Sequence, residues 1–88
     1  MNISDIQRKD TDEYLFTLNN KLFTYRSYQW AKMTECYSSN EQGDWASPWD
    51  EYQVGSYMPL DRNNPEQGIE LFFRRFGNST MPPEEDPI

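Results

Sequence analysis

Two β-prone runs separated by a pair of asparagines constrain the fold of this chain more than any other feature. Residues 14–18 (YLFTL) and 21–26 (KLFTYR) flank Asn19-Asn20. Asparagine tolerates positive φ better than most non-glycine residues, and a two-residue hairpin turn needs that conformation. The pattern therefore predicts a β-hairpin over about residues 13–28. Counting outward from the turn gives these facing pairs: Leu18 with Lys21, Phe16 with Phe23, Tyr14 with Tyr25 and Glu13 with Arg26.

A second pattern predicts a helix over about residues 65–76. Asn64 is a suitable N-cap, and Pro65 suits the first helical position. Apolar side chains then recur on one helical face, at Ile69, Phe72, Phe73 and Phe76. Gly77 follows where a left-handed glycine commonly ends a helix. Gly68, inside the helix, costs about 1 kcal/mol relative to alanine.

Together these elements predict an α+β fold, a small antiparallel sheet built on the N-terminal hairpin with the C-terminal helix packed on it. A chain of 88 residues forms one domain. We expect this domain over residues 1–77, followed by an extended tail rich in proline and acidic residues over 78–88. Residues 27–37 extend the second strand or form a helix, and residues 51–58 alternate loosely as a strand does. The first dozen residues are ambiguous.

The core of such a domain must be thin. Leu, Ile, Val and Phe make up only 15 of 88 residues, beside a net charge of −7. Six tyrosines and three tryptophans compensate, because each ring can bury roughly 150–250 Å². Small chains with thin cores often gain stability by oligomerising, so a homo-oligomer is one expectation.

Negative charge is concentrated in the middle of the chain. Residues 35–70 hold eight acidic groups and one basic group, which amounts to the whole net charge of −7. Tyrosine and tryptophan, which are common at binding hot spots, interleave with these acids. The candidate partner-binding residues are Glu41, Asp44, Trp45, Trp49, Asp50, Glu51, Tyr52, Asp61 and Glu66. Two plainer interpretations stay open: a solvated acidic loop, and tryptophans that fill the core.

Charge and aromatic content predict a protein that binds a basic partner. The adjacent basic pairs Arg8-Lys9 and Arg74-Arg75 are too small to hold nucleic acid directly. The acidic surface instead resembles nucleic acid, which favours an inhibitor or accessory protein encoded by a virus or mobile element. Such a DNA mimic occupies the basic site of a larger protein, for example a nuclease. The alternatives are a structural or assembly subunit that docks through the aromatic hairpin face, and an antitoxin or immunity-type regulator.

Most catalytic chemistry is missing from the sequence. There is no histidine and a single cysteine, Cys36, so a hydrolase triad, a cysteine-pair metal site and an internal disulfide are all excluded. Residues 61–72 begin like a calcium loop, but Pro65 and Glu66 stand where a ligand and a glycine are needed. We therefore expect no enzyme activity, no cofactor and no metal. No apolar run is long enough to span a membrane, and the lone cysteine favours a cytoplasmic location, in the host cell if the protein is viral.

Overall fold

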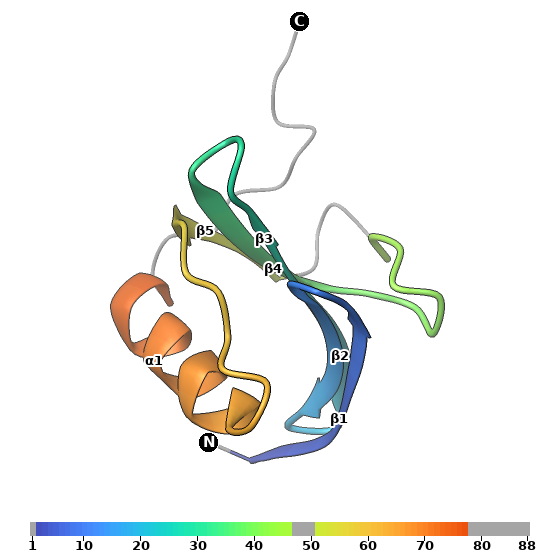
Figure 1. Ribbon diagram of the computed structural model, residues 1–88. Coiled ribbons are helices and arrows are strands. Elements are labelled where there is room, and N and C mark those ends of the chain that lie inside the picture. Colours follow the sequence, from blue (N-terminus) through green and yellow to red (C-terminus); the bar gives the residue numbers. More distant parts are fainter. Residues whose placement is uncertain (1, 47–50, 78–88) are drawn as a thin grey trace, which may run out of the picture.

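The computed structural model describes residues 2–46 and 51–77, which form a curved antiparallel sheet and one helix (Figure 1). The five strands lie side by side in chain order. Figure 1 shows the sheet bending around the helix, which covers one of its two faces. The elements are β1 (Ile3–Asp10), β2 (Glu13–Leu18), β3 (Lys21–Tyr28), β4 (Met33–Ser38), β5 (Tyr52–Ser56) and α1 (Pro65–Phe76).

The predicted hairpin is present in the predicted register. Phe16 pairs with Phe23, and the other facing pairs also match. Both turn residues have positive φ, 52° at Asn19 and 69° at Asn20, so this is the mirror-image turn that suits twisted strands. The rings of Phe16 and Phe23 stack with their centroids 5.9 Å apart.

The hairpin is one part of a longer meander. Residues 27–37 form neither a single strand extension nor a helix. Instead β3 ends at Tyr28, a turn with Lys32 at φ 56° follows, and β4 pairs back on β3. The strand suggested within residues 51–58 is β5. The ambiguous N-terminal residues form β1, whose pairing with β2 contains register shifts and whose Asp5 has φ 53°.

The helix has its predicted bounds, and Asn64 and Gly77 are its cap residues, but neither has the expected cap geometry. The Asn64 side chain makes no hydrogen bond to the helix backbone, and its Nδ2 donates to Gln67 Oε1 at 2.8 Å. Gly77 is right-handed, with φ −62°, rather than left-handed. Its N–H donates to the carbonyl of Phe73 at 2.8 Å and so continues the helical hydrogen-bonding pattern. Gly77 therefore needs no left-handed freedom.

The core lies between α1 and the inner face of the sheet. Its buried side chains are Tyr14, Phe16, Leu18, Phe23, Tyr25, Cys36, Leu60, Ile69 and Phe72. The four aromatic rings of the hairpin are at most 1% exposed, so within the domain this face is buried in the core. Two glycines permit close contact: the Phe76 ring lies against Gly55, and Leu60 packs on Gly68. The helix contacts both edge strands, β1 and β5.

Candidate functional site

The sheet face turned away from α1, here called the outer face, carries a different set of side chains. Successive strand residues point to opposite faces, so the residues that alternate with the core set lie outside. They include Glu13, Leu15, Thr24, Arg26, Tyr28, Glu35, Tyr37 and Tyr52. Charged, aromatic and polar side chains are thus arranged in register across β2 to β5.

Arg26 lies at the centre of the outer face. Its Nε and Nη2 atoms are each 3.1 Å from Glu13 Oε2 across the β2–β3 pair. Its guanidinium carbon is 5.7 Å from the centre of the Tyr37 ring. Burial alone would lower the pKa of Arg26, but the hydrogen bond with Tyr28 and the nearby Tyr37 and Glu13 raise it above its ordinary value. Arg26 is therefore a permanent positive charge whose main partner is internal.

Glu35 on β4 accepts hydrogen bonds from two tyrosines. The Tyr28 hydroxyl donates to Oε2 at 2.7 Å, and the Tyr52 hydroxyl donates to Oε1. Burial, followed by the hydrogen bond to the Glu35 carboxylate, raises the pKa of both phenols. Both tyrosines stay protonated at neutral pH and hold the carboxylate in one orientation, which suits a fixed recognition surface rather than proton transfer.

Residues 39–46, here called the outer loop, fold over this face. Asn40 Oδ1 accepts hydrogen bonds from the backbone N–H groups of Gln42 and Asp44 at 3.0 and 2.9 Å. Gly43, at φ 88°, offers its carbonyl to the Tyr37 hydroxyl at 2.9 Å and to Arg26 at 3.4 Å. A left-handed residue at this position favours glycine. These contacts fix the outer loop against the sheet.

Trp45 joins the outer loop to the sheet. Its ring centroid is 5.3 Å from that of Tyr37 and 4.8 Å from that of Tyr52, edge to face in both cases. Tyr37 and Tyr52 are themselves stacked, with their ring centroids 5.9 Å apart. Each such pair contributes about 0.5–1.5 kcal/mol beyond area burial. The half-buried Trp45 therefore mainly holds the outer loop against the sheet.

Trp30, in contrast, is presented to solvent. It lies in the turn between β3 and β4 and is 85% exposed. Its ring contacts only Tyr28 among the aromatic rings of the described residues, with 6.0 Å between centroids. Tyr28 also lines a concavity of about 350 Å³, together with Asp10, Thr11, Asp12, Glu13, Arg26 and Ser27. Tyr28 thus contacts the exposed indole and also lines this concavity.

The residues predicted from the sequence do not form one patch. Trp45 and Tyr52 meet on the outer face, and Glu41 and Asp44 lie in the same loop as Trp45. Glu51 precedes β5 and lines a different pocket. Glu66 lies in the first turn of α1 and Asp61 in the segment before it, and Figure 1 shows α1 on the other side of the sheet from the outer loop. Trp49 and Asp50 lie outside the described residues.

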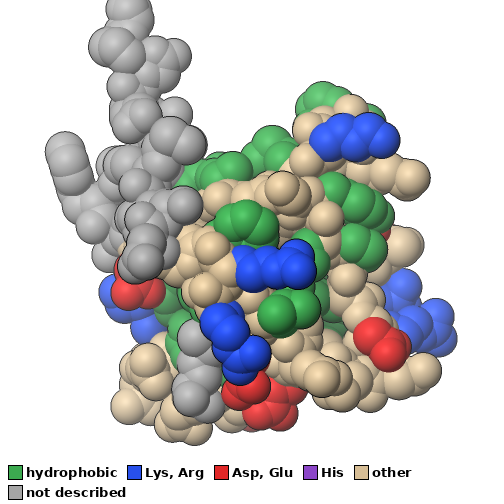
Figure 2. Space-filling view, turned by 90° about the vertical axis from the view of Figure 1, so that its left-hand side faces the viewer, with side chains coloured by type: hydrophobic (Ala, Val, Ile, Leu, Met, Phe, Trp, Pro, Cys, Tyr) green, Lys and Arg blue, Asp and Glu red, His purple; other side chains and the backbone are tan. Residues whose placement is uncertain are grey.

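Charge on the helix side is mixed. Figure 2 shows acidic and basic side chains interspersed with hydrophobic ones on that face. The Asp61 carboxylate accepts a hydrogen bond from the backbone N–H of Asn63 at 2.9 Å and so supports the turn before α1.

Sequence reasoning also missed Arg26, Tyr28, Trp30 and Glu35 as members of the site. Only the β3–β4 register brings these residues together, and their local sequence carries no signal for it.

No known protein family, curated protein or solved structure matches this chain. Among residues 2–46 and 51–77 no helix has the length and apolarity needed to cross a membrane. Within the same ranges, no three acidic, histidine or cysteine side chains converge on a point where a metal ion fits. A functional site must therefore be inferred from the outer face and the pockets themselves.

Proposed function

We propose that this protein is an acidic inhibitor or accessory protein that docks its outer face on a basic site of a larger protein. The observation that carries the proposal is the exposed Trp30, whose ring contacts Tyr28, a residue that also lines the hollow formed with Asp10, Asp12, Glu13 and Arg26. An indole with a large apolar area and a polar N–H is the kind of side chain that dominates binding energy at interfaces. The carboxylates of Asp10 and Asp12 in that hollow suit an arginine that pairs with an acid and stacks on a ring.

Electrostatics supports a basic partner. The net charge is −7, and Arg26, the cation at the centre of the outer face, already has Glu13 as its partner. Asp10 and Asp44 remain exposed. Long-range attraction between such a surface and a cationic groove accelerates encounter. A nucleic-acid-binding protein such as a nuclease has a groove of this kind, so the partner class is a nucleic-acid enzyme blocked by charge mimicry.

Rigidity of the outer face also supports this role. The hydrogen bonds at Glu35 and Gly43 and the packing of Trp45 order the surface before any partner arrives. A preordered surface loses less conformational entropy on binding. Inhibitors of this type are typical of viruses and mobile elements and act in the cytoplasm of the host cell. An immunity-type regulator would use the same surface.

The test compares two double variants with equal changes in charge. Asp10→Lys with Asp44→Lys alters the outer face, whereas Asp61→Lys with Glu66→Lys alters the helix side. Tagged proteins are used to capture partners from a lysate of the source cell, in low and high salt and with duplex DNA as a competitor. We expect the outer-face pair, added salt and DNA each to release the captured protein, and the helix-side pair to have little effect.

The substitution Trp30→Ala tests the aromatic contact without changing the charge of the protein. Because hot-spot truncations cost about 2 kcal/mol or more, we expect about a thirtyfold loss of affinity for the captured protein. Capture that is indifferent to DNA, to salt and to the outer-face pair contradicts charge mimicry. Equal losses from both charge pairs contradict the assignment to the outer face.

A further inference from the structure

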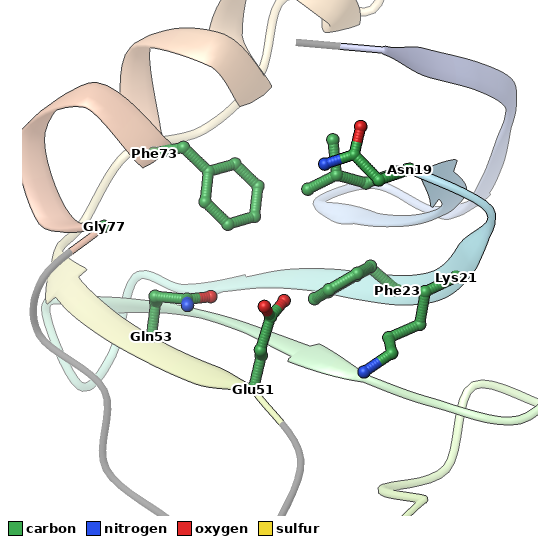
Figure 3. Close-up of a pocket in the computed structure, with 8 residues that line it drawn as sticks. Asn19, Lys21, Phe23, Glu51, Gln53, Phe73 and Gly77 are labelled. Atoms are coloured by element: carbon green, nitrogen blue, oxygen red, sulfur yellow. The ribbon is translucent and has the colours of Figure 1, made fainter.

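The two edges of the sheet differ in how well they are protected against pairing with another strand. β1 and β5 are the edge strands, and Figure 3 shows β5, which carries Gln53, at the margin of the sheet. β1 has register shifts in its pairing with β2, Asp5 at φ 53°, and the exposed charges of Arg8 and Lys9. Irregular pairing and charged side chains of this kind keep an edge strand from pairing with other chains. β5 lacks these devices, because residues 52–56 (YQVGS) contain no charge and no proline and their register with β4 is unbroken.

The backbone of β5 carries a row of hydrogen-bonding groups that point away from the sheet. The N–H of Ser38 donates to the carbonyl of Glu51 at 3.0 Å, and the N–H of Tyr57 donates to the carbonyl of Lys32 at 3.1 Å. Residues of an antiparallel strand turn alternately toward and away from the neighbouring strand, so every second residue from 51 to 57 faces β4. The residues whose N–H and C=O groups face away from β4 are Tyr52, Val54 and Ser56. Within the described part of the chain, these outward groups have no hydrogen-bond partner.

The chain leaves this edge directly after β5. The N–H of Met58 donates to Thr34 Oγ1 at 2.7 Å, and the carbonyl of Met58 accepts a hydrogen bond from Ser27 Oγ at 2.9 Å. The segment after β5 therefore turns onto the inner face and does not continue along the edge. Val54 is half-buried and Ser56 is exposed.

We propose that two copies of this chain pair through β5, antiparallel about a two-fold axis at Val54. In this register Val54 faces Val54 of the second copy, and Tyr52 faces Ser56 of the second copy. The three outward residues are evenly spaced about Val54, so the strand is complementary to its own reversed copy. Each outward N–H then donates to an outward carbonyl across the interface, as in any antiparallel pair.

The charges near β5 favour a second copy as the occupant, despite the net charge of −7. The nearest acid along the chain, Glu51, faces Tyr57 of the second copy in this register. The two Glu51 residues are thus six residue steps apart, about 20 Å, which is about twice the Debye length at 0.1 M salt. The exposed Lys32, which is bonded to Tyr57, lies in the same row as Glu51 of the second copy, about two strand spacings or 10 Å away. The pairing therefore brings opposite charges closer than like charges.

The symmetry of this pairing has a consequence for the proposed function. A two-fold axis through an antiparallel strand pair is perpendicular to the sheet, so the outer faces of both copies lie on the same side. The dimer thus presents two Trp30 turns to a partner at once. The pairing itself uses the backbone of β5 and does not rest on the proposed docking function.

The first test is sedimentation equilibrium of the full chain from about 1 µM to 1 mM, in low and high salt. We expect a monomer–dimer equilibrium with a Kd on the order of 10 µM. Added salt should strengthen the dimer, because it screens the repulsion between two acidic copies. Val54→Lys places two lysines opposite each other and should weaken the dimer at least about tenfold. Gln7→Lys makes the same change in charge at an exposed residue of β1 and should leave the Kd unchanged.

The second test determines the register by cysteine cross-linking. Val54→Cys should form a disulfide-linked dimer under mild oxidation, because directly opposed residues have Cα atoms about 5.5 Å apart. Ser56→Cys should not, because its counterpart in the second copy lies four residue steps, or about 13 Å, along the strand. The native Cys36 is 0% exposed and does not compete.

Three results overturn the pairing: a monomer at 1 mM, a dimer that is indifferent to Val54→Lys, or equal cross-linking of the two cysteine variants. Thermal melts confirm that each variant is folded. A monomeric protein that still captures a basic partner contradicts the pairing alone. A dimer that captures none contradicts only the proposed docking function.

Discussion

Replacing Gly55 by alanine tests the packing of α1 on the edge of the sheet. A Cβ atom at Gly55 would lie 2.5 Å from Cγ and 2.6 Å from Cε2 of the Phe76 ring, whereas ordinary contact begins near 3.4 Å. The ring must therefore move by about 1 Å away from Gly55, although it also packs on Phe72, with 5.2 Å between the ring centroids. Overpacking of this kind typically costs about 1–3 kcal/mol.

Alanine also has a compensating advantage. In the middle of a strand it is about 0.5–1 kcal/mol more favourable than glycine, because less backbone entropy is lost. We expect Gly55→Ala to lower the free energy of unfolding by about 1–2 kcal/mol overall. For a domain of this size that lowers Tm by about 4–16 °C.

The assay is a double-mutant cycle with Phe76→Ala, followed by urea unfolding. Without the ring the overlap disappears, so Gly55→Ala should stabilise the Phe76→Ala protein by about 0.5–1 kcal/mol. The coupling energy of the cycle then isolates the steric overlap. If Gly55→Ala destabilises both backgrounds equally, the Phe76 ring is not the reason for glycine at this position.

Three further outcomes follow from burial. Trp30→Ala should change the free energy of unfolding by less than about 0.5 kcal/mol, whereas Trp45→Ala should lower it by about 1–3 kcal/mol. Equal effects of the two substitutions in chemical unfolding would contradict an exposed Trp30 and a Trp45 that holds the outer loop on the sheet. Burial raises the pKa of Tyr37 and Tyr52 above the ordinary value, so their stabilising contribution is present below about pH 10 and is lost as the pH rises further. Absorbance at alkaline pH should show them ionising together with unfolding, and reversible ionisation in the folded protein near pH 10 would contradict this. The Cys36 thiol is 0% exposed and burial raises its pKa well above the ordinary value, so a thiol reagent should react only after denaturant is added; rapid reaction of the native protein would contradict this.

The sequence predicted the elements that carry their own local signals. The hairpin depends on Asn19 and Asn20, and the helix depends on the spacing of its phenylalanines, so both were correct in position. β1 escaped prediction because its pairing is irregular and most of its side chains are exposed, which removes the alternation that identifies a strand. β4 escaped because it is defined by pairing with β3 and not by its own residues.

The candidate site was harder to predict than the fold. Asp44 and Asp61 belong to one acidic stretch of sequence, yet the meander carries them to opposite sides of the molecule. Arg26 and Glu35 are separated in sequence but face each other across β3 and β4. Linear charge density therefore identified the acidic character of the protein, whereas the positions of these charges in space required the register of every strand.

The contact of α1 with both edge strands has a consequence for biosynthesis. The helix follows all five strands along the chain, so a ribosome releases the whole sheet before the element that covers its aromatic inner face. At that stage the nascent chain exposes the apolar inner face of the sheet, to which chaperones or other nascent chains can bind. The sheet is therefore covered only after α1 has been synthesised, and slow translation of α1 would favour aggregation.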